Sequence, residues 1–97
     1  MKYIKAKDRD FTFDEDQLEE LKAYYRFNLE EEKELFEGYI KDGFMTKKEA
    51  KERFLEVKEF NKELDRCNNI FEAAEFLNSR RDFADIYEEF VIKEYDF

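Results

Sequence analysis

Apolar residues recur every three or four positions along most of the chain, the spacing that places them on one side of an α-helix. This spacing holds from residue 18 to residue 77, and it predicts several short helices there. The segment 1–13 lacks it and alternates weakly around the polar residues 8–10. We therefore predict extended structure for this first segment.

Helix-capping residues divide the helical region into separate elements. Thr12 and Asp14 each precede, by three positions, a residue that completes a capping box, so either can start the first helix. Asn28 with Glu31 repeats the same spacing, which predicts that the first helix ends there and a second begins. One continuous helix over 14–41 is the alternative.

The clearest local signal is a turn between two helices. Gly43 can adopt the left-handed conformation that ends a helix, and Phe44 would then fold back on Tyr39. Thr46 and Glu49 form a capping box for the next helix. This pattern predicts an antiparallel helical hairpin. It resembles the Gly-hydrophobic-Thr-x-x-Glu turn of short oligomerisation hairpins such as the SHOCT domain, and no function is carried over from that likeness.

The helix after the turn is predicted to run to about residue 66. Its apolar stripe consists of Ala50, Phe54, Val57, Phe60 or Asn61, and Leu64. Asn68 or Asn69 then starts a helix that is apolar on most sides through Leu77, so we expect it at the centre of the protein.

The last segment carries two signals in succession. From Asp82 to Phe90 the apolar residues keep helical spacing, and after Phe90 they lose it and can form a strand. Such a strand would pair with the extended N-terminal segment, and each would cover an edge of the other.

These elements predict a mainly α protein, with residues 1–97 forming a single helical domain. We expect a small bundle of four to five short helices, with a minor β-pairing of the N- and C-terminal segments as an addition. Half of the residues are Ala, Glu, Lys, Leu or Arg, a helix-forming composition. With 12 Phe and 6 Tyr, aromatic rings must fill much of the core.

The residues that are missing exclude most site chemistry. The chain has no His and one cysteine, Cys67, so imidazole-based catalysis and the usual zinc sets are excluded. Gly38 and Gly43 form no phosphate-binding loop. Oxygen-bearing residues over 8–19 follow the spacing of an EF-hand, but Phe13 stands where that loop needs Gly. We predict no enzyme activity, no cofactor, no metal site and a buried, structural Cys67.

The chain also carries no sign of export or membrane insertion. No stretch reaches the roughly 18 apolar residues of a membrane span, and the N-terminal segment has no apolar core of signal-peptide length. A single cysteine excludes a disulfide within the chain, which fits a reducing compartment. We therefore expect a cytoplasmic protein that does not bind membranes, located in the host cytosol if a phage encodes it.

Negative charge is unevenly distributed along the chain. The net charge is −9, and residues 14–37 contain ten acidic and three basic residues. One interpretation is a solvated surface that keeps an aromatic-rich protein in solution. The other is an acidic surface that binds a basic surface of a partner protein, through these candidate residues: Asp14, Glu15, Asp16, Glu19, Glu20, Glu30, Glu31, Glu32, Glu34 and Glu37. Direct binding to nucleic acid is disfavoured, because it requires cationic side chains.

In size, acidity and aromatic content the chain resembles small acidic inhibitors encoded by phages and mobile elements, such as anti-CRISPR and anti-restriction proteins. The resemblance is one of composition over the whole chain. It implies a DNA mimic that occupies the nucleic-acid groove of a host defence nuclease. The alternative function is a structural or oligomerisation helical module with no inhibitory role, and the protein can be a monomer or a homodimer.

Overall fold

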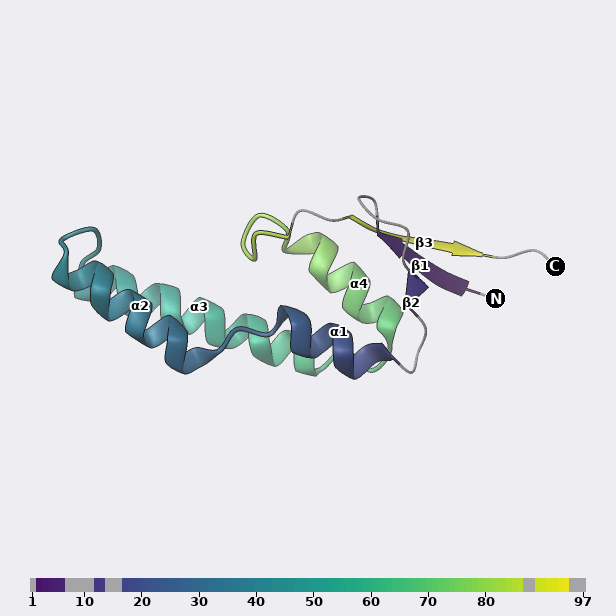
Figure 1. The fold of residues 1–97 in the computed structure, drawn as a ribbon, viewed down its shortest axis with the longest axis horizontal. Helices are drawn as coiled ribbons and strands as arrows, with labels where there is room; N and C mark the ends of the chain where they lie inside the picture. The colour runs from purple at the N-terminus through teal and green to yellow at the C-terminus, as the bar shows by residue number, and fades with distance from the viewer. Residues whose placement is uncertain (1, 7–11, 14–16, 87–88, 95–97) are drawn as a thin grey trace. The chain divides into compact units, whose positions relative to one another are not determined.

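The computed structural model describes residues 2–6, 12–13, 17–86 and 89–94 (Figure 1). The chain divides into two compact units, Met1–Tyr25 with Leu64–Phe97 and Arg26–Glu63. In chain order the elements are β1 (Lys2–Ala6), β2 (Thr12–Phe13), α1 (Leu18–Tyr25), α2 (Leu29–Lys41), α3 (Lys47–Asp65), α4 (Ile70–Ser79) and β3 (Phe90–Glu94).

The first unit contains an antiparallel sheet with the strand order β2-β1-β3. Ile4 is opposite Ile92 and Ala6 is opposite Phe90 in the β1–β3 register, so these residues share one side of the sheet. Ile4 and Phe90 are buried, and β3 packs against α4. This side of the sheet is therefore the one that faces the core.

Helix α4 is the centre of the first unit and packs against both β3 and α1. It begins at the cap Asn69, whose side chain accepts a hydrogen bond from the backbone N–H of Glu72. Apolar residues on one side of the helix are fully buried: Ile70, Ala73, Ala74 and Leu77. Leu21 of α1 and Leu64 at the end of α3 are buried in the same unit.

Two polar side chains fasten elements of the first unit. Asn78, near the end of α4, donates to the backbone oxygen of Phe90 at 2.7 Å and accepts from its N–H at 2.9 Å. Lys22 of α1 is buried, and its ammonium group donates to the backbone oxygen of Asp65 at 3.1 Å. Asp65 is the last residue of α3, so this cation meets the negative end of the helix dipole.

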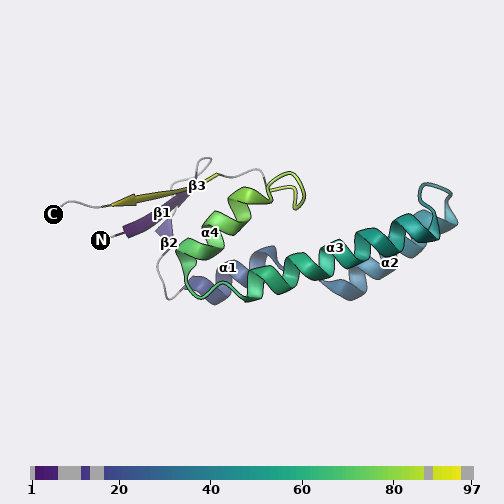
Figure 2. The same cartoon turned by 180° about the vertical axis from the view of Figure 1, so that it is seen from behind.

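The second unit is an antiparallel hairpin of α2 and α3, which lie side by side in both views (Figures 1 and 2). Asn28 caps α2 by accepting hydrogen bonds from the N–H groups of Glu30 and Glu31. The turn has the predicted geometry, because Gly43 has φ = 80° and Phe44 N–H bonds to the oxygen of Tyr39 at 2.9 Å.

The next helix is capped as the sequence predicts. Glu49 N–H donates to the hydroxyl of Thr46 at 3.1 Å. Buried Phe36, Ala50, Val57 and Phe60 form the hairpin core. Asn61 ties the start of the hairpin to α3, since its amide accepts from Phe27 N–H at 2.9 Å and donates to the Phe27 oxygen at 3.0 Å.

The structure confirms a mainly helical protein with an antiparallel pairing of its N- and C-terminal segments. It also confirms that the helix breaks at Asn28, so the single helix over 14–41 is wrong. Thr12 cannot cap α1, because it lies in β2. Cys67 is buried, as predicted.

The prediction of a last helix from Asp82, within a bundle of four to five helices, is wrong. Residues 80–85 form turns where the spacing from Asp82 predicts a helix. Asp85 has a left-handed φ of 51°, and a residue in this conformation ends a helix. In place of one bundle, α2 and α3 form a hairpin in one unit, while the other combines α1 and α4 with the sheet.

Candidate protein-binding surfaces

The ten predicted binding residues fall into three groups. Asp14, Glu15 and Asp16 lie outside the described residues. Glu19 and Glu20 are exposed in the first turn of α1, in the first unit. The other five are on α2, in the second unit: Glu30, Glu31, Glu32, Glu34 and Glu37. Since an α-helix turns by about 100° per residue, the α2 carboxylates also point in different directions.

Three of the α2 carboxylates form a line on the exposed side of the helix. Glu30, Glu34 and Glu37 are spaced by four and three positions, so they share one side of α2; we call them the carboxylate stripe. All three are exposed, and none makes an ion pair of 4.0 Å or less with a described residue. Their charge is therefore directed to solvent.

Helix α3 carries a line of lysines in the same unit. Lys47, Lys51, Lys58 and Lys62 are spaced by four, seven and four positions, so they share one side of α3; we call them the lysine stripe. All four are exposed. A shallow hollow of the hairpin is lined by Lys33, Glu37, Lys47 and Lys51 together with Phe36, Ile40, Ala50 and Phe54. On this side of the hairpin, Lys33 and Glu37 of α2 therefore border Lys47 and Lys51 of α3.

The opposite side of the hairpin is acidic and partly apolar. Glu31, Leu35 and Tyr39 follow one another at four-residue steps, and Glu31 and Leu35 lie roughly 100–180° around α2 from the residues of the hollow. Glu49 and Glu56 lie on the side of α3 opposite the lysine stripe by the same geometry, and Glu52 lies between them and Leu55 around the helix. These six residues form what we call the acidic face.

The acidic face contains apolar side chains that the fold leaves uncovered. Leu35 is 45% exposed, Tyr39 38% and Phe44, in the turn beside Tyr39, 78%. Glu56 is paired with Arg53 at 3.0 Å and Glu49 accepts from the Thr46 hydroxyl. Glu31 and Glu52 form no ion pair of 4.0 Å or less with a described residue. The face thus combines free carboxylates with an apolar line.

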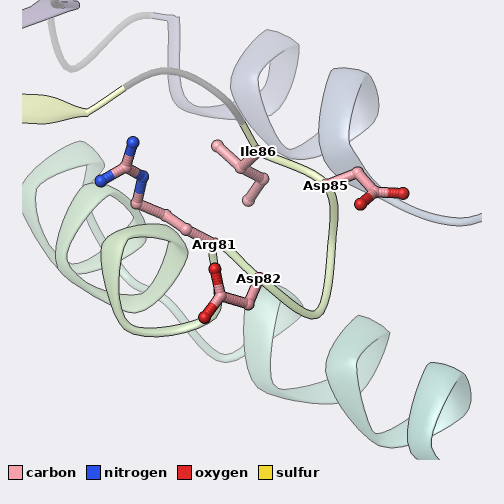
Figure 3. Close-up of a pocket in the computed structure, with 4 residues that line it drawn as sticks. All are labelled: Arg81, Asp82, Asp85 and Ile86. Atoms are coloured by element: carbon pink, nitrogen blue, oxygen red, sulfur yellow. The ribbon is translucent and has the colours of Figure 1, made fainter.

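A second hollow lies after α4, in the first unit. It is lined by Arg81, Asp82, Asp85 and Ile86 (Figure 3). The guanidinium group of Arg81 and the carboxylates of Asp82 and Asp85 point in three different directions. They do not converge on one point, as groups that act on a single bound atom would have to.

Within the residues that the structure describes, no three Asp, Glu or Cys side chains are placed to hold a metal ion. Among the helices of this part of the chain, none has both the length and the apolar content needed to cross a membrane.

Sequence reasoning missed the residues that organise these surfaces. The charge count treats α3 as balanced, because its acidic and basic residues nearly cancel along the chain. A helical projection would have separated them, since the lysines recur at four- and seven-residue steps and Glu49, Glu52 and Glu56 at steps of three and four. The apolar residues Leu35 and Tyr39 are exposed and follow Glu31 along the same side of α2.

Comparison of the chain with models of known families, with curated proteins and with solved structures found no match.

Proposed function

We propose that this protein is a non-enzymatic inhibitor whose carboxylate stripe binds a basic surface of a partner protein. This partner surface otherwise binds nucleic acid. A defence nuclease of the kind that anti-CRISPR or anti-restriction proteins inhibit has such a surface. The observation that carries the proposal is the exposure of Glu30, Glu34 and Glu37 without an ion pair of 4.0 Å or less to any described residue.

The spacing of the stripe supports this kind of partner. Carboxylates four residues apart on a helix are separated by about 6 Å along its axis, and one DNA strand has a phosphate every ~3.4 Å. One helix therefore offers about half the charge density of a strand. Of the lysines and arginines that are spaced for phosphates, every second one can therefore meet a carboxylate of such a helix.

The charge of the chain also favours association with a basic partner. A net charge of −9 on 97 residues attracts a cationic groove over a distance set by the Debye length, about 10 Å at 0.1 M salt. Such attraction mainly raises the association rate. Binding should therefore weaken as the salt concentration rises.

The test is inhibition of DNA cleavage by a panel of purified RNA-guided and restriction nucleases. We expect stoichiometric inhibition of at least one enzyme, and loss of most of it in Glu30→Lys/Glu34→Lys. The matched control is Glu75→Lys/Glu89→Lys, which makes the same charge change on exposed residues of the first unit. Circular dichroism shows whether each variant remains folded.

Two results would contradict the proposal. One is inhibition that Glu30→Lys/Glu34→Lys leaves unchanged in strength and in salt dependence. The other is a panel in which the wild-type protein inhibits no nuclease, even at low salt where electrostatic attraction is strongest.

A further inference from the structure

The hairpin has two exposed surfaces of opposite charge, each with an apolar residue within it. The acidic face has Glu31, Leu35 and Tyr39 along α2 and Glu52 on α3. On the other side, the lysine stripe borders Leu55, which is 54% exposed. Isolated exposed leucines are common on protein surfaces. Two surfaces that have opposite charge and that both expose apolar side chains are expected to bind each other.

We propose that the protein associates with a second copy of itself, with the lysine stripe of one copy docked on the acidic face of the next. Leu55 of the first copy then packs against Leu35 and Tyr39 of the second. Lys51 and Lys58 of the first copy lie beside Glu31 and Glu52 of the second. The apolar contact removes exposed surface from water, and the charges set the orientation.

Several observations favour a second copy over another occupant. An acidic surface is expected to bind a basic one. Among the described residues, the lysine stripe is such a basic helical surface, and every copy of the chain carries it. None of its four lysines makes an ion pair of 4.0 Å or less with a described residue.

The geometry makes this association head to tail. The two surfaces lie on different sides of the hairpin, so docking leaves one free surface of each kind at the ends of the complex. Contacts of this type add further copies or close into a ring, in contrast to a two-fold dimer. The average size should therefore increase with concentration and decrease with salt.

Sedimentation velocity of the full chain provides the first measurement. From about 10 μM to about 1 mM protein, we expect growing assemblies at about 0.1 M salt, where a Debye length of about 10 Å already limits the repulsion between copies of net charge −9. At about 0.5 M salt the contact charges are screened as well, and we expect largely monomer. A monomer over the whole concentration range at about 0.1 M salt would overturn the proposal, and so would association that a further rise in salt does not weaken.

Two variants then test the assignment of the surfaces. Leu35→Ser/Glu52→Gln alters the acidic face, and Leu55→Ser/Lys51→Gln alters the lysine stripe. All four side chains are exposed, so the fold should be retained, which thermal unfolding checks. Each variant alone should self-associate at least about tenfold more weakly than the wild type.

Mixing the two variants provides the decisive step. The first retains an intact lysine stripe and the second an intact acidic face, so an equimolar mixture should form a 1:1 complex that cannot grow further. A mixture that remains monomeric, or variants that associate as strongly as the wild type, would overturn the proposal.

The control variant is Glu30→Gln/Glu34→Gln, because these residues belong to neither surface. It should associate as the wild type does. The same pair is altered in the inhibition test, so loss of inhibition with unchanged self-association would separate the two functions. Self-association that is lost in this control would place the contact elsewhere and contradict the assignment.

Discussion

The two units of the chain bury different kinds of residues. Among the described residues, the largest fully buried side chains are Phe60, in the hairpin, and Ile4, Leu21, Leu64, Ile70 and Leu77, all in the first unit. The hairpin core depends on aromatic rings, with Phe27 and Phe60 5.2 Å apart between ring centres and Phe36 and Phe54 6.4 Å apart. The first unit thus has a mainly aliphatic core, in which Phe90 is also buried, and the hairpin has a thin core in which rings predominate.

The hairpin, which buries fewer of the described apolar residues, exposes more of them on its surface than the first unit does. The hairpin exposes Leu35, Tyr39, Phe44 and Leu55 beside its charged stripes, whereas the first unit exposes only Tyr24 and Val91 among the described large apolar residues. Buried apolar area stabilises a fold, and exposed apolar area beside charge binds partners. We infer that the first unit supplies most of the stability and that the hairpin supplies the binding surfaces.

The largest expected effect is a cavity in the first unit. Leu77→Ala removes a side chain with 0% exposure and should lower the free energy of unfolding by about 2–5 kcal/mol, through lost burial and the cavity left behind. Urea denaturation measures the loss. The control Leu55→Ala alters an exposed residue of the hairpin and should change stability by less than about 0.5 kcal/mol. Equal losses would contradict the comparison.

Asn78 in the first unit and Asn61 in the hairpin each make two hydrogen bonds to the backbone of one phenylalanine, and we call these pairs the asparagine clamps. They allow a matched test in both units. Asn78→Ala leaves the N–H and oxygen of Phe90 without the amide partner, and Asn61→Ala does the same for Phe27. Each should cost about 1–3 kcal/mol, the usual penalty for part-buried polar groups that lose their partner. Urea unfolding followed by circular dichroism compares them. A change within experimental error for both would show that water replaces the clamps without loss.

The smallest expected effects concern the two glycines of the hairpin. Gly43→Ala places a side chain at φ = 80° and should destabilise the protein by about 1–2 kcal/mol. Gly38→Ala, in α2 where the added methyl group meets no atom within 4 Å apart from its chain neighbours and the helix's own backbone, should stabilise it by about 0.5–1 kcal/mol. Thermal unfolding measures both. Shifts of the same sign would mean that one of the two backbone conformations differs from the one described.

Local signals in the sequence predict much of the hairpin. The caps Asn28 and Thr46 and the left-handed Gly43 act within a few residues of themselves, so their effect can be read from spacing alone. The helix start at Asn69 is predictable for the same reason.

Features that depend on distant contacts could not be predicted. Lys22 is buried because its ammonium group reaches the backbone oxygen of Asp65, and nothing near Lys22 in the sequence indicates this. The hydrogen bond of Asn78 to Phe90 joins residues twelve positions apart, and no local signal indicates the left-handed φ of Asp85. The sequence predicts the candidate site as a run of acidic residues. In the structure, the described residues of this run lie on two helices, α1 and α2, and those of α2 point in different directions.

Native-state hydrogen exchange, followed by NMR, tests most directly whether the first unit supplies the stability and the hairpin the surface. The amides of β1, β3 and α4 should exchange only by global unfolding, with an opening free energy equal to that from urea denaturation. The amides of α2 and of the first turns of α3 should open at a lower free energy, because fewer buried apolar side chains hold them. Equal or greater protection in the hairpin would contradict this division of roles.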